Sequence, residues 1–204
     1  MKLRLIRHPR PAVVEGLCYG RMDVPPDAAH LQAMTERLAA RWRGGARPLP
    51  ALVFSSPLRR CTQLAEALAS SLAADGWPPT RLDARIAEMD FGHWEGTRWN
   101  EIPPAELAAW RADIAELAPP GGESLRALSL RALDFVEREL LSAALPPDAE
   151  VVVVTHAGVI QALRQTLRGE PLAQLGGLRL DFGTITTLVR RQGRFELEAV
   201  NEAP

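Results

Sequence analysis

The sequence feature that most constrains the fold is an unbroken run of valines at residues 151–154, which leads through Thr155-His156-Ala157-Gly158 into a helical pattern. β-branched residues favour strands, and a continuous apolar run is typical of a strand that is buried on both faces. The apolar residues that follow recur at helical spacing as far as Gly169, where a helix is expected to end. Because such a strand needs a layer of helices on each side of its sheet, this segment predicts an α/β fold.

The rest of the chain repeats this alternation of strand and helix. Strands are expected at residues 2–6, 51–54, 81–84, 185–189 and 195–200. Helices are expected at residues 27–43, 105–118 and 124–141, and another is expected to open at Ser55-Ser56-Pro57, where a serine cap and an early proline are typical of a first turn. We therefore predict a single three-layer α/β/α domain over residues 1–204 with a mainly parallel sheet.

Composition and charge argue against several classes of function. The 204 residues include 24 Lys and Arg and 25 Asp and Glu, for a net charge of -1, so no global field attracts nucleic acid or an anionic membrane. The sequence has neither an apolar run of about 18 residues nor a signal-peptide pattern. Cys18 and Cys61 lack the spacing of a metal knuckle or a redox pair. We expect a cytoplasmic protein without nucleic-acid or membrane partners, either a monomer or a homodimer.

Residues suited to phosphoryl chemistry fall at the ends of the expected elements. Arg7-His8 follows the first strand, Arg59-Arg60 follows the second, Glu88 lies in an irregular loop, and His156 follows the valine strand. We expect both histidines at one edge of the sheet, because the carboxyl ends of parallel strands meet there. Arginine charge keeps a nearby imidazole neutral and binds phosphate oxygens, while a carboxylate can protonate a leaving oxygen. This set favours an anion site over a zinc site.

The same residues lie in four ordered motifs that resemble those of the histidine phosphatase superfamily, which includes the phosphoglycerate mutases. The motifs are Leu5-Ile6-Arg7-His8, Ser55-Ser56-Pro57-Leu58-Arg59-Arg60-Cys61-Thr62-Gln63, Glu88-Met89-Asp90-Phe91-Gly92-His93-Trp94-Glu95-Gly96 and Val154-Thr155-His156-Ala157-Gly158. The pattern Arg7-His8-Pro9-Arg10-Pro11, followed by Cys18-Tyr19-Gly20-Arg21-Met22-Asp23-Val24-Pro25, is similar to that of the α-ribazole phosphatases of cobalamin biosynthesis. The resemblance implies a phosphoglycerate mutase-like fold.

For function, the resemblance implies a phosphomonoesterase that needs neither a metal nor a cofactor. His8 would attack phosphorus and become phosphohistidine, and Glu88 would serve first as an acid and then as a base. The phosphate oxygens would be held by Arg7, Arg60 and His156, and the rest of the substrate is expected to contact Tyr19 and Arg21. The implied substrate is a small phosphomonoester, α-ribazole 5′-phosphate or cobalamin 5′-phosphate.

Three alternatives stay open at this point. The chain could be a phosphatase of broad specificity, a phosphoglycerate mutase that returns the phosphoryl group to a partner hydroxyl, or a regulatory module that only binds phosphorylated ligands. The presence of both His8 and Glu88 favours an enzyme over a binding module. One departure from the family pattern is Pro9, which replaces the usual glycine, fixes a backbone angle and removes an N–H group. Arg59 is expected to be a solvated neighbour of Arg60.

Overall fold

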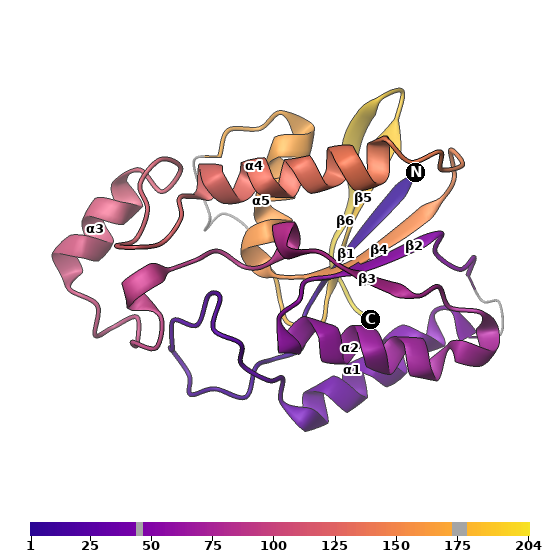
Figure 1. Ribbon diagram of the computed structural model, residues 1–204, viewed down its shortest axis with the longest axis horizontal. Helices are drawn as coiled ribbons and strands as arrows, with labels where there is room; N and C mark the ends of the chain where they lie inside the picture. The colour runs from indigo at the N-terminus through magenta and orange to yellow at the C-terminus, as the bar shows by residue number, and fades with distance from the viewer. Residues whose placement is uncertain (44–46, 173–178) are drawn as a thin grey trace.

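The computed structural model describes residues 1–43, 47–172 and 179–204, and these residues form a six-stranded sheet with helices on both faces (Figure 1). The strands are β1 (Lys2–Arg7), β2 (Leu52–Ser55), β3 (Thr80–Leu82), β4 (Glu150–Thr155), β5 (Ile185–Arg191) and β6 (Arg194–Glu202). Their order is β3-β2-β4-β1-β5-β6. The first four strands in this order pair in parallel, and β5 and β6 are antiparallel. The predicted, mainly parallel α/β sheet is confirmed.

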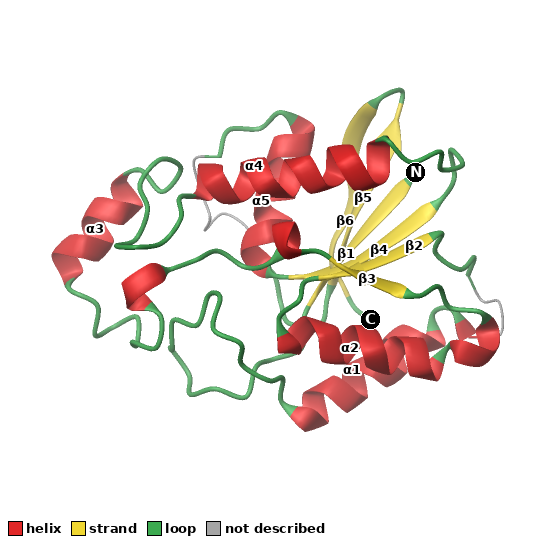
Figure 2. Ribbon diagram, viewed as in Figure 1, coloured by secondary structure: helices red, strands yellow, loops and turns green. Residues whose placement is uncertain are grey.

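The helices are α1 (Ala28–Ala40), α2 (Arg59–Ser71), α3 (Pro104–Ala112), α4 (Leu125–Phe135) and α5 (Ala157–Arg168). One pair of helices, α1 and α2, covers one face of the sheet, and a second pair, α4 and α5, covers the other, whereas α3 lies away from the sheet (Figure 2). The fully buried valines of β4 alternate between the two faces: Val151 and Val153 pack in the same cluster as α4 and α5, whereas Val152 and Val154 pack with α1 and α2. The strand predicted at the valine run is therefore confirmed; the structure places it inside the sheet, between β2 and β1, with a hydrophobic core on each side.

Three helix boundaries differ from the prediction. α1 ends at Ala40 rather than at residue 43. α2 begins at Arg59 rather than at residues 55–57, because Leu58 keeps an extended backbone and the Ser56 hydroxyl accepts from Leu58 N, at 3.3 Å, ahead of the helix. α3 ends at Ala112 rather than at residue 118. There Asp113 leaves the helical region and its side chain accepts from Glu116 N at 3.3 Å, so a local side-chain contact replaces the next helical turn. By contrast, the helix expected at 124–141 is continued beyond α4 by a π-helical segment, Val136–Leu141.

Two long connections, residues 8–27 between β1 and α1 and residues 83–103 between β3 and α3, extend from the carboxyl ends of the strands and lie side by side (Figure 1). In the first of them, Cys18 N donates to Thr97 O at 2.9 Å, and Gly96 N of the second donates back to Cys18 O at 2.8 Å. Phe91 and the indoles of Trp94, Trp99 and Trp110 pack together beneath the second connection, with ring centroids 5.2–6.4 Å apart. This aromatic group is continuous with the hydrophobic core on the α4 and α5 side of the sheet, so the loops that border the edge of the sheet are packed onto that core.

A buried ion pair fastens β1 to β4. Arg4 donates from Nε to Glu150 Oε2 at 2.5 Å and from Nη2 to Glu150 Oε1 at 2.9 Å, and the Arg4 side chain is 3% exposed. Such a two-pronged contact fixes orientation as well as distance. Removing Glu150 would leave the guanidinium charge buried without its main partner, which is far more costly than losing a surface pair.

We therefore predict that Glu150→Ala lowers the free energy of unfolding by about 3 kcal/mol. The matched control is Glu198→Ala, which breaks the exposed Lys2–Glu198 pair and should cost less than about 1 kcal/mol. Urea denaturation of both variants beside the wild type measures the difference. Equal losses in the two variants would show that the Arg4–Glu150 pair does not stabilise the central strands in this way.

Candidate active site

The two histidines follow neighbouring strands and meet at the edge of the sheet. β1 and β4 pair in parallel with Arg7 opposite Thr155, so the next residue of each strand reaches the same level. His8 N donates to Thr155 O at 2.9 Å, and the centroids of the His8 and His156 rings are 5.0 Å apart. Both side chains are buried. The structure thus brings together the two histidines that the sequence assigned to one edge.

Hydrogen bonding shows which nitrogen of His8 is free. Nδ1 lies 2.6 Å from the carbonyl oxygen of Pro9, and because that oxygen can only accept, we assign the ring hydrogen to Nδ1 and the lone pair to Nε2. Pro9 therefore serves this site through its carbonyl group. Burial, reinforced by the charges of Arg60 and Arg7, holds the pKa of His8 well below its ordinary value. The ring is neutral at pH 7.

His156 is held on both sides. Its Nδ1 accepts from Arg60 Nε at 3.3 Å, which leaves the ring hydrogen on Nε2, 2.7 Å from the Ser56 hydroxyl oxygen. Burial, with the charges of Arg60 and then His8, lowers the pKa of His156 well below its ordinary value. Sequence reasoning interpreted Ser56 as part of a helix cap and missed this contact. The signal available was its place in the same motif as Arg60.

Arg60 is a fully buried cation beside His156. Its Nη1 donates to Met22 O at 2.8 Å and its Nη2 to Gly20 O at 2.5 Å, so it ties the 8–27 connection to the start of α2. The Tyr19 ring lies 5.1 Å from the guanidinium carbon. Arg59, by contrast, is exposed, in agreement with its expected role as a solvated neighbour.

Arg7 lies flat on an aromatic ring that sequence reasoning missed. Its guanidinium carbon is 3.7 Å from the centroid of Phe182, and the same ring is 5.6 Å from that of His8. Arg7 also donates to the carbonyl oxygen of Leu180. Its Nε is buried and has no hydrogen-bond partner among the residues that the structure describes. Phe182 belongs to no expected element or motif, so the sequence carried no signal for it.

Glu88 reaches the site from the loop after β3. Its Oε1 accepts from Met89 N at 3.0 Å, and its Oε2 accepts from Gly158 N at 3.3 Å, in the first turn of α5 and two residues after His156. A Cβ atom at Gly158 would lie 2.4 Å from Glu88 Oε1. A glycine at this position therefore allows the carboxylate to approach the N-terminus of α5.

Tyr19 and Arg21 have different surroundings. Tyr19 borders the cluster through Arg60, whereas the Arg21 guanidinium lies near Glu123, with Nη2 3.2 Å from Oε1, and near Asp90, with Nη1 3.7 Å from Oδ2. Arg21 Nε also donates to Glu88 O at 3.4 Å. The structure thus connects Arg21 with the loop that carries Glu88, and its contact with substrate stays a prediction.

A pocket of about 420 Å³ opens next to the two aromatic rings that contact Arg7 and Arg60. Tyr19 and Phe182 line it on the side of the cluster. The remaining lining residues are Arg10, Pro11, Val13, Val14, Glu15, Gly16 and Leu17. A larger cavity, of about 590 Å³, lies near the ends of α3 and α5, and none of its lining residues belongs to the cluster. A smaller pocket, of about 190 Å³, is lined by Glu88 and Gly158 together with Met89, Phe91, Ala157, Gln161 and Leu180. The pockets at Tyr19 and at Glu88 both border the candidate site, and the one at Tyr19 is the larger of the two.

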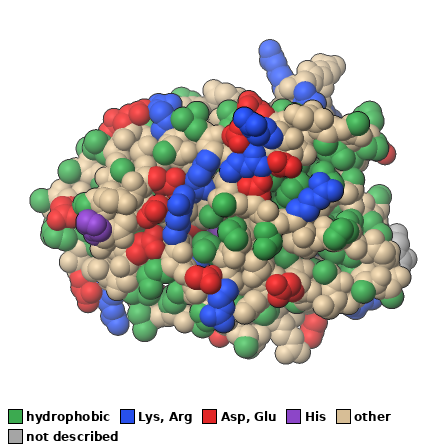
Figure 3. All heavy atoms as spheres, viewed as in Figure 1, with side chains coloured by type: hydrophobic (Ala, Val, Ile, Leu, Met, Phe, Trp, Pro, Cys, Tyr) green, Lys and Arg blue, Asp and Glu red, His purple; other side chains and the backbone are tan. Residues whose placement is uncertain are grey.

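Basic and acidic side chains lie interspersed on the face of the protein that Figure 3 shows. Within residues 1–43, 47–172 and 179–204, no group of three His, Cys, Asp or Glu side chains is arranged to hold a metal ion. In the same ranges, no helix is both long enough and apolar enough to cross a membrane.

The burial of His8 as a neutral ring predicts sensitivity to acid. Below about pH 6.5 the unfolded chain takes up a proton at each histidine, whereas folded His8 does so only at lower pH, so stability falls as the pH drops through this range. For His8→Asn, we expect the loss of unfolding free energy between pH 7 and pH 5 to be smaller than in the wild type by about 2 kcal/mol. Urea denaturation at both pH values measures it, and identical losses would contradict a neutral, buried His8.

Comparison with known proteins shows the family to which the chain belongs. Residues 3–203 match the model of the histidine phosphatase superfamily, branch 1. The glucosyl-3-phosphoglycerate phosphatase of Mycolicibacterium vanbaalenii is 36% identical over 65% of this chain, and the match spans 61% of that protein's length. The adenosylcobalamin/α-ribazole phosphatase of Salmonella typhi is 27% identical over 98% of this chain and 96% of its own.

The fold comparison covers almost the whole chain. The native structure of a mycobacterial glucosyl-3-phosphoglycerate phosphatase superimposes with a TM-score of 0.83 at 28% identity, over 99% of both chains. The family match extends over both strand-end histidines, the buried arginine and the Glu88 loop. The chain therefore belongs to the histidine phosphatase superfamily, branch 1.

Proposed function

We propose that the protein hydrolyses a small phosphomonoester through a phosphohistidine at His8. The observation that carries this proposal is the state of the His8 ring: Nδ1 is held by Pro9 O, so Nε2 has its lone pair available, and the neutral ring lies beside two guanidinium groups. A neutral imidazole next to fixed positive charge is suited to attack phosphorus. The Nε2–P bond would form as the bond between phosphorus and the leaving oxygen breaks.

The arginines and His156 are proposed to bind the phosphoryl oxygens. Arg7 and Arg60 supply permanent positive charge, and the buried Nε–H of Arg7 lacks a partner among the described residues, so it is a donor for one oxygen. The single N–H of His156, on Nε2, is held by the Ser56 hydroxyl in the present structure, and it would turn from that hydroxyl to a phosphoryl oxygen when the substrate binds. Because these groups neutralise charge on the phosphoryl oxygens, the proposed steps use no metal.

Glu88 is proposed to move the protons in both steps. In the first step its carboxylic acid would protonate the departing oxygen, and in the second its carboxylate would take a proton from the water that attacks phosphorus. The N–P bond then breaks and inorganic phosphate is released, which restores His8 and protonated Glu88. The hydrogen bond from Gly158 N to Glu88 Oε2 supports this role, because Gly158 follows His156 by two residues and so holds the carboxylate near that histidine.

For the substrate, we propose α-ribazole 5′-phosphate. Its flat aromatic base suits a pocket with Tyr19 and Phe182 on one side and apolar side chains on much of the rest. A second candidate is glucosyl-3-phosphoglycerate, which is favoured by the 36% identity to a phosphatase named for that compound. The second compound carries sugar hydroxyls and a carboxylate, for which Arg10 is the cation that lines the pocket.

An assay of phosphate release tests this function. The panel contains α-ribazole 5′-phosphate, glucosyl-3-phosphoglycerate, 3-phosphoglycerate and p-nitrophenyl phosphate, with EDTA present. We expect kcat/KM for the ribazole compound to be the highest by about tenfold or more, and to fall at least about a thousandfold in His8→Ala.

The outcomes of this assay separate the alternatives. Preference for glucosyl-3-phosphoglycerate would replace the proposed substrate and leave the mechanism intact. Near-normal turnover by His8→Ala would overturn the mechanism. Without release from any compound, isomerisation of 3-phosphoglycerate would identify a mutase, and its absence would leave a phospholigand-binding module.

The role of Glu88 is tested by adding one methyl group. In Gly158→Ala the new Cβ would lie 2.4 Å from Glu88 Oε1 in the present conformation, so the flexible carboxylate must move away. Alanine also favours a helix over glycine by about 1 kcal/mol, so we expect thermal stability to be retained. We expect kcat/KM for the preferred substrate to fall by about tenfold or more. Full activity in a stable Gly158→Ala protein would show that the position of Glu88 does not control the reaction.

A further inference from the structure

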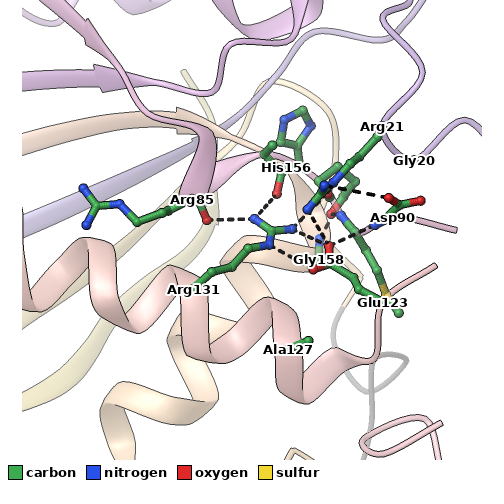
Figure 4. A network of polar contacts seen from close by, with 12 residues as sticks. Gly20, Arg21, Arg85, Asp90, Glu123, Ala127, Arg131, His156 and Gly158 are labelled. Carbon is green, nitrogen blue, oxygen red and sulfur yellow. Dashed lines mark hydrogen bonds and ion pairs between the residues drawn. The ribbon is translucent and has the colours of Figure 1, made fainter. Parts of the chain in front are cut away.

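Arg131 of α4 lies at the centre of a polar network behind the loop that carries Glu88 (Figure 4). Its Nη1 donates to the carbonyl oxygens of Arg85 and Ala87, each at 2.7 Å, and its Nη2 donates to Glu88 O at 3.0 Å. One side chain therefore holds three carbonyl groups within four consecutive residues, and the last of them belongs to Glu88 itself.

Glu123 completes the network on the other side of Glu88. Its Oε1 accepts from Arg131 Nη2 at 2.6 Å and from Asp90 N at 3.0 Å, and its Oε2 accepts from Arg131 Nε at 3.0 Å. Although burial opposes ionisation, the hydrogen bonds from Arg131 hold the pKa of Glu123 below its ordinary value. Arg131 therefore binds the main chain of the loop at residues 85–88, and Glu123 binds it at residue 90.

The geometry separates Arg131 from the arginines assigned to phosphate. A guanidinium group has five N–H donors, and all five of Arg131 are directed at the loop carbonyls and Glu123. Its side chain is 17% exposed and that of Glu123 is 14% exposed. Arg131 therefore has no N–H group left for a substrate, and any effect on the reaction has to pass through the loop.

We propose that the Arg131–Glu123 pair positions Glu88 for proton transfer, an inference that rests on the proposed function. The Glu88 carboxylate reaches Gly158 N only while its own main chain stays in place, and Arg131 binds that main chain directly. Proton transfer requires hydrogen-bond reach, so a small displacement of the loop lowers the rate steeply. Arg21, in the same 8–27 connection as Tyr19, donates both to Glu88 O and to Glu123 Oε1. These contacts link the 8–27 connection to the Arg131–Glu123 pair.

The test uses two leaving groups that differ in their need for an acid. The alkoxide of α-ribazole 5′-phosphate, or of glucosyl-3-phosphoglycerate if the panel favours it, must be protonated as it departs, whereas p-nitrophenolate leaves without a proton. For Arg131→Met we expect kcat/KM for the alkyl ester to fall by about tenfold or more and that for p-nitrophenyl phosphate by less than about threefold. The ratio of the two values, measured on one sample, does not depend on the fraction of folded protein.

Three further variants sharpen the test. Arg126→Met is the matched control, because it removes an exposed arginine of α4 that pairs with the exposed Glu116, and it should leave both values unchanged. Arg131→Lys keeps the charge opposite Glu123 but cannot reach three carbonyls, so it should lower kcat/KM for the alkyl ester by an intermediate factor. If Arg131→Met does not fold, Arg131→Lys is used in its place. In a Glu88→Gln background, Arg131→Lys should have less than about a twofold further effect on the alkyl ester.

Equal losses for both esters in Arg131→Met and Arg131→Lys would overturn the proposal and leave the pair a purely structural role. Unchanged values for both esters would overturn it as well, and so would a full further loss in the Glu88→Gln background. Failure of the wild type to release phosphate from either ester would instead count against the proposed function. The two failures are therefore distinguishable.

Discussion

The parallel pairing of β1 with β4 is the constraint on which the site depends. It places Arg7 opposite Thr155 and so delivers His8 and His156 to one edge, with their rings 5.0 Å apart. Two imidazoles buried this closely cannot both be charged, because burial and neighbouring arginines oppose protonation. Their neutral state requires acceptors and donors of fixed geometry. Pro9 O, Ser56 and Arg60 supply them, and each comes from the segment that directly follows a strand of the sheet.

The sequence could predict whatever depends on local pattern. The valine run predicted a buried strand, and the positions of His8 and His156 after strands predicted that the two histidines meet at one edge of the sheet. The ordered motifs indicated the family that the comparison shows. Contacts between distant segments could not be predicted in this way. Phe182 lies in no motif, and Arg131 occupies a polar position of a helix, where sequence alone does not distinguish a solvated arginine from one whose five donors are all engaged.

The architecture assigns different tasks to different parts of the chain. Strand ends and the first turns of α2 and α5 hold the residues proposed to bind phosphate, and these parts have little freedom to move because both faces of the sheet are buried. Glu88 comes from a loop whose position depends on α4. The pocket beside Tyr19 is built from the 8–27 connection and Phe182, so its shape can change without altering the strand ends. This division fits a family whose members are named for different phosphate esters.

The central claim is that the phosphoryl group passes through His8 before it reaches water. The most direct measurement is the stereochemical course of hydrolysis, with a substrate whose phosphorus is made chiral by oxygen isotopes and with labelled water. Each in-line displacement inverts the configuration at phosphorus, so two successive transfers, first to His8 and then to water, predict overall retention. Overall inversion would mean that water attacks the substrate directly, and it would contradict the account.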